Sequence, residues 1–267
     1  MNTLQMALAD GMTITKRNAL KIKRAPDLLG GVVLLPIVLV LLFTYVFGSM
    51  IELSGMSYAE YLLPGIFVMT ITTSAQITGY TLTLDLQKGI FDRFRSLPMS
   101  PSAVLTGQTA SDLIINVTSI ATMALVGLLV GWRVHTSPLE AALGFLVLLL
   151  FAYAFSWVTA TVALALRTPE MFNNVATIVS LPLIFLSNAF VDSARLPGPL
   201  KVVAEWSPLS TLIQGTRELF GNTSPAMPVP SAWPLQHAVP ASILWSLVLL
   251  VVFVPLATRL YKRAVSQ

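Results

Sequence analysis

The 267-residue sequence contains no cysteine and only two histidines, His135 and His237. Without thiols there is no disulfide, no thiolate metal site and no cysteine nucleophile, and two histidines argue against a histidine-based metal cluster. The Gly-x-Ser-x-Gly signature of a serine hydrolase is also missing. Both histidines fall in predicted outer connections, where we expect solvated rather than catalytic side chains. The sequence therefore predicts no catalytic residue and no metal site.

Charge is scarce along the chain. Charged residues make up 10% of the sequence, hydrophobic residues make up 55%, and the mean hydropathy is +0.78. A soluble domain of this length does not need so much apolar surface to fill its core, so the composition predicts an integral membrane protein. The formal net charge of +4 is small. It matters through its placement along the chain and does not indicate nucleic-acid binding.

The chain also lacks its own means of using ATP. The stretch that begins at Gly107 has neither the lysine nor the preceding strand of a Gly-x-x-x-x-Gly-Lys-Ser/Thr phosphate loop. A proton-coupled secondary transporter would be expected to keep an acidic residue near the middle of a span. Asp112 comes nearest, but it falls in the first turns of the predicted third span, where the helix dipole stabilises an anion. We therefore favour a structural role for Asp112 over a coupling role.

Six apolar runs are each near or above the ~20 residues that cross a bilayer. Twelve of the sixteen Lys and Arg residues lie on one side of these runs, so the positive-inside rule places both termini in the cytoplasm. The sequence predicts an all-α polytopic protein of the cell (inner) membrane, with residues 25–267 as one six-span domain. The predicted spans cover residues 28–50, 61–84, 110–132, 139–166, 172–191 and 239–260.

Residues 1–24 show a different pattern. Apolar residues recur on one helical face, and five basic residues gather between Lys16 and Arg24. This pattern is typical of an amphipathic helix that lies in the cytoplasmic membrane interface. A plain basic tail beside the membrane is the alternative. The segment lacks the apolar core and cleavage site of a signal peptide, so we expect it to stay attached.

The densest charged stretch covers residues 88–99, between the second and third spans. Ile90, Phe91, Phe94 and Leu97 recur at helical spacing, with charged residues around the rest of the turn. We predict a short cytoplasmic amphipathic helix that ends at Pro98 and contacts a partner. The alternative is a loop whose basic residues only set the orientation of the chain in the membrane.

A long connection, residues 192–235, separates the last two predicted spans. Prolines and a glycine bound two short helical patterns, at residues 197–206 and 208–220. Beside a span that contains Pro182, these patterns suggest a re-entrant hairpin that enters the outer leaflet. Two helices on the outer surface fit the pattern equally well.

Two stretches carry a resemblance to a known family. Residues 89–99, Gly-Ile-Phe-Asp-Arg-Phe-Arg-Ser-Leu-Pro-Met, resemble the Gly-x-x-x-Arg-x-Arg-Ser-Leu-Pro stretch of type-2 ATP-binding cassette (ABC) exporter permeases of the daunorubicin-resistance-like branch. Residues 181–191, 196–197 and 206–217 are similar to that family's "LPLLFLSGAFVP", "LP" and "NPLT…R" pattern. Asn188 stands where the family often has glycine, and Asp192 where it often has proline. With six predicted spans, the resemblance covers nearly the whole chain.

The resemblance implies the membrane subunit of an ATP-driven exporter, which is itself not an enzyme. Two ATPase subunits would bring ATP and Mg²⁺, and a second permease copy would complete a dimer in membrane lipid. The implied coupling helix docks on the ATPase through Lys88, Gly89, Phe91, Asp92, Arg93, Phe94, Arg95, Leu97 and Pro98. The implied outer gate comprises Pro182, Phe185, Asn188, Phe190, Pro197, Pro208 and Arg217.

The apolar spans show no polar lumen of their own, so we place the substrate path between two subunits. A hydrophobic or amphipathic substrate, such as a drug, natural product or lipid, suits such a path. A proton-coupled secondary transporter and a non-transport assembly protein remain the alternative functions, and ordinary helix packing is the alternative role for the hydroxyl groups. The predicted path residues are Thr70, Thr72, Thr73, Ser74, Gln76, Thr78, Asn173, Asn174 and Thr177.

Overall fold

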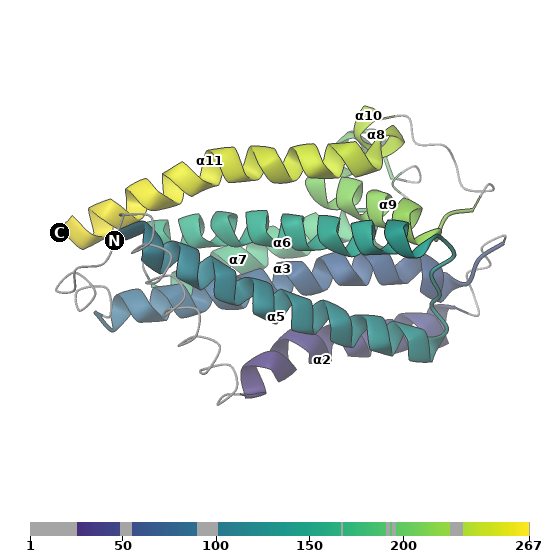
Figure 1. Cartoon of the computed structure of the whole chain (residues 1–267), viewed down its shortest axis with the longest axis horizontal. Helices are drawn as coiled ribbons and strands as arrows, with labels where there is room; N and C mark the ends of the chain where they lie inside the picture. Colours follow the sequence, from purple (N-terminus) through teal and green to yellow (C-terminus); the bar gives the residue numbers. More distant parts are fainter. Residues whose placement is uncertain are drawn as a thin grey trace.

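The computed structural model describes residues 26–48, 55–89, 101–166, 168–190, 193, 196–224 and 232–266. Every regular element within these ranges is a helix, so the predicted all-α fold is confirmed. The long helices run alongside one another, and α8, α9 and α10 gather at one end, which we call the α9 end (Figure 1). The elements are α2 (Pro26–Leu42), the π-helix η1 (Phe43–Phe47), α3 (Tyr58–Gln87), α5 (Pro101–Val130), α6 (Pro138–Leu166), α7 (Pro169–Phe185), α8 (Gly198–Glu205), α9 (Pro208–Phe220), α10 (Trp233–Gln236) and α11 (Ala238–Ser266).

Polar caps and prolines define where several helices begin. At the start of α3, the Ser57 hydroxyl accepts from the Glu60 main-chain N–H and the Glu60 carboxylate accepts from the Ser57 N–H, which is a capping box. The hydroxyls of Thr168 and Ser207 cap α7 and α9 by accepting from the Met171 and Leu209 main-chain N–H groups, and a proline follows each cap residue. Gly221, at φ 71°, ends α9 in the left-handed conformation, as the sequence predicted.

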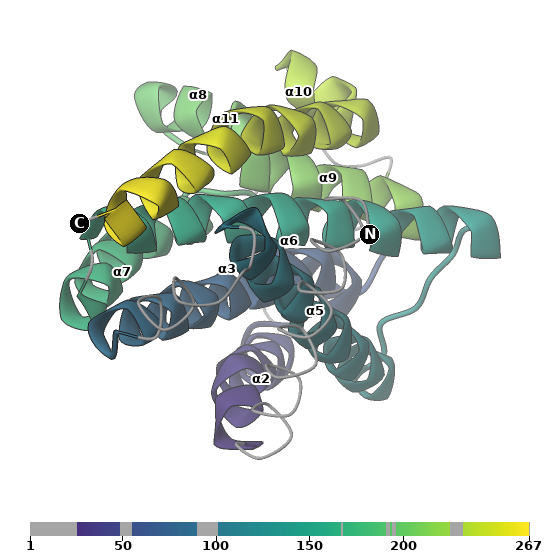
Figure 2. The same ribbon diagram turned by 60° about the vertical axis from the view of Figure 1, so that its left-hand side comes forward.

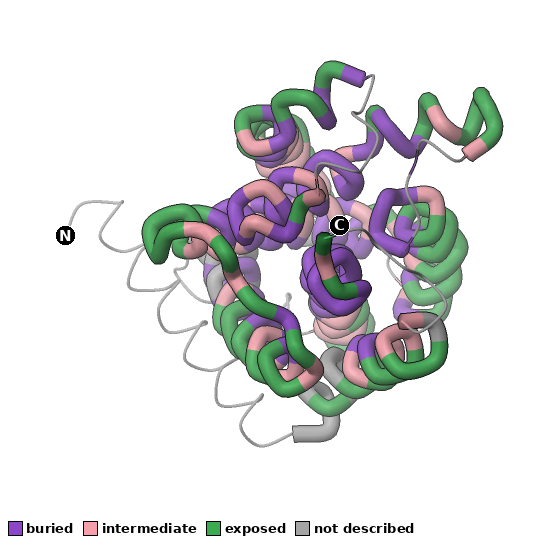
Figure 3. Tube along the Cα trace, turned by 90° about the vertical axis from the view of Figure 1, so that its right-hand side faces the viewer, coloured by how far each residue is buried: buried purple, intermediate pink, exposed green. Residues whose placement is uncertain are grey.

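Helix α3 forms the centre of the bundle. It packs against α2, α5, α6, α7 and α9, and 83% of its most apolar eighteen-residue window is buried. Figure 2 shows α2 on the side of α3 and α5 away from α11, which packs on α6 and α9. In Figure 3 the buried residues lie in the interior and the exposed residues on the outer faces. The fold therefore surrounds one mostly buried helix with partly exposed ones.

The outer faces of the bundle are apolar. Within the described residues, four helices are long and apolar enough to cross a membrane, at Tyr58–Gln87, Ser111–Val130, Pro138–Leu166 and Ala238–Arg263. A water-soluble protein rarely exposes so much contiguous apolar surface, whereas lipid solvates it. Large apolar side chains exposed on α2, α5, α7 and α11 include Leu34, Leu35, Leu125, Leu129, Ile178, Phe185, Leu244 and Val251.

Three predicted boundaries differ from the structure by six residues or more: the start of α5, the end of α7 and the end of α11, which continues to Ser266 where the sixth span was predicted to end at 260. Helix α5 begins at Pro101, nine residues before the predicted start at 110, and α7 ends at Phe185, six residues before the predicted end at 191. The apolar run marks the membrane-compatible part of a helix, and the polar first turns of α5 fall outside it. Beyond α7, Leu186 and Ser187 donate main-chain hydrogen bonds to Pro182 and Ile184 and form turns. The predicted helix at residues 1–24 lies outside the described residues.

Candidate functional site

A buried arginine joins three parts of the chain at the α9 end. Arg217, on α9, is 1% exposed. Its Nε donates to the main-chain oxygen of Tyr61 at 3.1 Å, and its Nη2 donates to that of Asn188 at 2.8 Å. The guanidinium carbon also lies 3.8 Å from the centroid of the Tyr61 ring, which is a cation–π contact. One side chain therefore links α9 to α3 and to the turn that follows α7.

The same turn is held by further contacts. The Tyr61 hydroxyl donates to the Asn188 oxygen at 3.4 Å, and the Asn188 N–H donates to the Ser210 hydroxyl at 3.3 Å. On α3, a Cβ added at Gly65 would lie 2.8 Å from the Cα of Ala189, so only glycine allows this approach. We call Arg217, Tyr61, Asn188 and Ser210 the arginine clamp.

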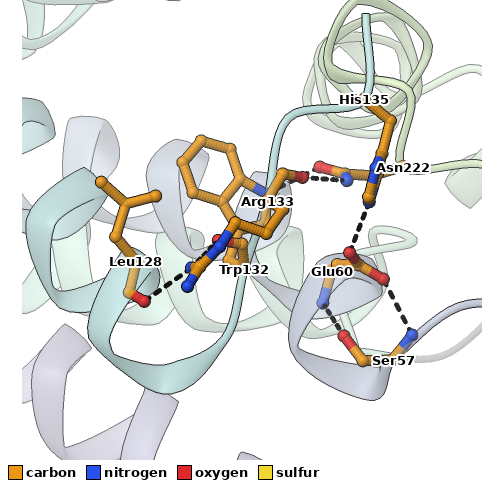
Figure 4. A network of polar contacts seen from close by, with 7 residues as sticks. All are labelled: Ser57, Glu60, Leu128, Trp132, Arg133, His135 and Asn222. Carbon is orange, nitrogen blue, oxygen red and sulfur yellow. Dashed lines mark hydrogen bonds and ion pairs between the residues drawn. The ribbon is translucent and has the colours of Figure 1, made fainter.

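A second polar cluster, at the same end of the bundle, fixes the connection between α5 and α6 (Figure 4). His135 Nε2 lies 2.6 Å from Glu60 Oε1, at the start of α3. The Trp132 indole donates to Asn222 Oδ1 at 2.7 Å, and Asn222 Nδ2 donates to the Arg133 oxygen at 2.9 Å. The α5–α6 connection is therefore attached both to α3 and to the segment after α9.

Part of the predicted gate set comes together here. Arg217 and Asn188 form the clamp, and the Phe190 ring stacks on Phe185 and Phe43 at centroid distances of 5.4 and 4.9 Å. The three prolines of the set instead bound or interrupt helices: Pro182 lies inside α7, Pro197 caps α8 and Pro208 begins α9. A gating role for these residues stays a prediction.

The predicted path residues do not share one surface. Thr70 is fully buried, and the hydroxyls of Thr70 and Thr73 donate to the main-chain oxygens of Ile66 and Met69, as is common in membrane helices. Gln76 is half-buried on α3. Asn173, Asn174 and Thr177 lie exposed on α7. The path itself stays a prediction.

Of the predicted coupling residues, the structure describes Lys88 and Gly89. The Lys88 N–H donates to the Leu84 oxygen at 3.0 Å, and the Gly89 N–H donates to the Leu86 oxygen at 3.0 Å. Gly89 has φ 63°, which a residue with a Cβ adopts at a cost of about 1–2 kcal/mol. Helix α3 therefore ends in a glycine turn directly before the predicted coupling helix. Phe91, Asp92, Arg93, Phe94, Arg95, Leu97 and Pro98 lie outside the described residues.

Sequence reasoning missed the cluster around His135. The His135 side chain is 54% exposed, in line with the expected solvated histidine, but its contact with the Glu60 carboxylate was not predicted. The Ser57-x-x-Glu60 spacing predicts the capping box, but no local pattern predicts a contact over 75 residues. Asn222-Thr-Ser matches a glycosylation sequon, yet Asn222 is buried and its amide is hydrogen-bonded. Within the described ranges, no three His, Asp or Glu residues form a group that could hold a metal ion.

The prediction that the helix dipole stabilises the Asp112 carboxylate in the first turns of its span is wrong. Because α5 begins at Pro101, Asp112 lies about 16 Å along the helix, and the dipole effect falls off within the first turn. Asp112 is instead buried, with its Oδ1 accepting from the Thr78 hydroxyl on α3 at 2.7 Å. This contact joins α5 to the central helix.

A helical bundle with an apolar exterior and four helices able to cross a bilayer defines a polytopic integral membrane protein. Residues 11–220 match the sequence model of the ABC-2 type transporter family, so the chain belongs to that family. It is 33% identical over 256 residues to the daunorubicin resistance ABC transporter permease protein DrrB1 of Streptomyces coeruleorubidus, covering 96% of this chain and 87% of the relative. It is also 26% identical over 217 residues to the putative transport permease ycf38 of Porphyra purpurea, covering 79% and 73% of the two chains. The suspected resemblance is confirmed, and the chain is an ABC transporter permease.

Proposed function

We propose that this chain moves a hydrophobic or amphipathic substrate, such as a drug, natural product or lipid, outward across the cell membrane. Two copies of a separate ATPase subunit supply the energy with ATP and Mg²⁺, and two permease copies form the membrane part. This proposal rests on family membership over most of the chain, together with a relative named for daunorubicin resistance that aligns over 96% of the chain.

The arrangement of the helices supports coupling at the end opposite the α9 end. The last residues of α3 and the first of α5 lie there, on either side of residues 90–100, and so does the end of α11 (Figure 1). Basic residues flank these helix ends, which suits a cytoplasmic surface. We propose that this end is cytoplasmic, with both termini, and that residues 88–99 contact the ATPase.

Two further helices complete six crossings in this proposal. Helix α2 continues directly into η1, so the helical backbone covers residues 26–47. Helix α7 has 17 residues and spans about 25 Å, somewhat less than the ~30 Å hydrocarbon layer. The turn at residues 186–190, which the arginine clamp holds, extends it. Helices α8 and α9 then form the re-entrant hairpin, because α9 is mostly buried against α3, α6 and α11.

Three exposed polar side chains on α7 support a substrate path between two permease subunits. Asn173, Asn174 and Thr177 lie on the bundle surface within a proposed span. A polar side chain that faces lipid is costly, so such residues usually face a partner helix or a water-filled cavity. We propose that these residues face the second permease copy. The arginine clamp holds the gate segment at the outer end of this path.

The first test is transport in proteoliposomes. Vesicles that contain this permease and its ATPase should export a fluorescent amphipathic drug only with hydrolysable ATP, and vesicles with the permease alone should not. A non-hydrolysable ATP analogue is the matched control. Drug movement by the permease alone under a proton gradient would show a secondary transporter and overturn the proposal.

Topology provides a separate prediction. A reporter fused after Gln267 should be cytoplasmic, whereas a reporter inserted at Ser137, between α5 and α6, should be external. Cysteine accessibility is a second measurement, because the native chain has no cysteine to interfere. Finding both positions on one side of the membrane would rule out six crossings with this orientation.

A further inference from the structure

A buried polar cluster lies between α3, α5 and α6, away from both clusters at the α9 end. Its centre is Asp112, which is 1% exposed. Its Oδ1 accepts a hydrogen bond from the Thr78 hydroxyl on α3 at 2.7 Å. The hydroxyl of Ser156, on α6, lies beside the same carboxyl group. Asn116, one turn further along α5, is equally buried.

The hydrogen bonds of this cluster leave acceptors without a donor. The Ser156 hydroxyl lies 3.0 Å from the Ala152 main-chain oxygen, so its one hydrogen is shared between that oxygen and the Asp112 carboxyl group. The Asn116 amide donates to the main-chain oxygen of Asp112 at 2.9 Å, and its Oδ1 is a buried acceptor without a partner. Asp112 Oδ2 is likewise buried and without a partner. Asp112 Oδ2 and Asn116 Oδ1 are therefore two buried acceptors to which no described residue donates a hydrogen bond.

Charge leads to the same conclusion. An ionised carboxylate without a counter-ion is strongly unfavourable in such an interior, because the charge has lost its hydration. Within the described part of the chain, no Lys or Arg forms an ion pair with Asp112, whose side-chain neighbours there are hydroxyl and amide groups. The titratable residues on the helices packed against α5 are Asp27, Tyr58, Glu60, Tyr61, Tyr80, Asp85, Glu140, Tyr153, Arg259, Tyr261, Lys262 and Arg263.

We propose that Asp112 is a proton-binding site inside the membrane domain. A proton from water binds the carboxylate at Oδ2, forms one O–H bond and leaves the side chain neutral. The new O–H donates to Asn116 Oδ1 or Ser156 Oγ, while Oδ1 keeps its hydrogen bond from Thr78. The proton thus supplies the missing donor and lets α5 pack on α3 and α6 without a buried charge. This proposal does not depend on ATP coupling or on the substrate.

Infrared spectroscopy of the purified full chain in lipid nanodiscs tests the site directly. At neutral pH we expect the C=O stretch of a protonated carboxylic acid, with a small shift in D₂O. Asp112→Asn should abolish this band and keep the fold, because an amide resembles a neutral acid in shape and hydrogen bonding. Glu140→Gln is the matched control and should leave the band unchanged, since Glu140 is exposed at the start of α6.

If Asp112→Asn does not fold, two other variants can test the proposal through the same infrared band. Asn116→Ala or Ser156→Ala removes an acceptor, so one of them should shift the band to higher frequency. Two results would overturn the proposal. If the band is missing and Na⁺ or K⁺ raises the melting temperature of the wild type but not of Asp112→Asn, the cluster binds a metal cation. If the band is missing and salt has no such effect, Asp112 is an ionised, hydrated carboxylate.

Discussion

Replacing Arg217 with leucine is expected to destabilise the protein more than any other change at the α9 end. The substitution removes two hydrogen bonds from a buried charged group and the cation–π contact with Tyr61. Hydrogen bonds to charged groups contribute roughly 1.5–3 kcal/mol each, so we expect a loss of about 3 kcal/mol or more. Thermal unfolding in detergent, followed by tryptophan fluorescence, should show a lower midpoint, and transport should be lost at equal membrane abundance.

Arg133 offers a matched control on the neighbouring connection. It is exposed, and its guanidinium donates to two nearby main-chain oxygens, those of Leu128 and Trp132. Arg133→Leu should therefore change the stability by about 0.5 kcal/mol or less. Arg217→Lys should fall between the two variants, because a lysine keeps the charge but cannot donate in two fixed directions. Equal midpoints for the Arg217 and Arg133 variants would show that the clamp does not hold α9 to α3.

The helices were predictable because hydrophobic runs and turn residues are local features. The run at residues 139–166 predicted α6 to within one residue, and Pro208 with Gly221 predicted both ends of α9. The start of α5 was not predictable in the same way, because its first turns are polar and a hydropathy argument detects only the apolar part. The length of a helix can therefore exceed the length of the apolar run that predicts it.

The arginine clamp was only partly accessible from sequence. The resemblance selected Arg217 and Asn188, but Tyr61 and Ser210 enter through contacts between segments far apart in the chain. For Asp112 the sequence was misleading, because its position near the start of the apolar run suggested that it lies in the first turns of a helix. Only the packing of α3 and α6 around α5 shows that this carboxyl group is buried, with one oxygen that accepts no hydrogen bond from the described residues. Local patterns identify residue types, whereas tertiary packing decides their electrostatic role.

The coupling stretch gives the prediction with the largest effect on transport. Phe94→Ala should abolish ATP-driven transport or release the ATPase while the permease stays inserted in the membrane. An amphipathic helix transmits force only if its apolar residues fit a pocket on the partner. Truncating an aromatic interface hot spot costs about 2 kcal/mol or more, roughly a 30-fold loss of affinity. An exposed ion pair contributes only about 0–1 kcal/mol.

The charged residues of the stretch provide the comparison. Arg93→Ala and Arg95→Ala should weaken ATPase co-purification less than Phe94→Ala, although both arginines match the family pattern and could pair with acids on the partner. Phe185→Ala controls for aromatic truncation as such, since Phe185 is 61% exposed and is the last residue of α7, outside the coupling stretch. It should leave co-purification unchanged. If the arginine variants alone release the ATPase, charge pairing is the anchor. If alanine substitutions across residues 88–99, with Phe91, Phe94 and Leu97 included, all retain ATPase association and transport, the stretch only orients the chain in the membrane.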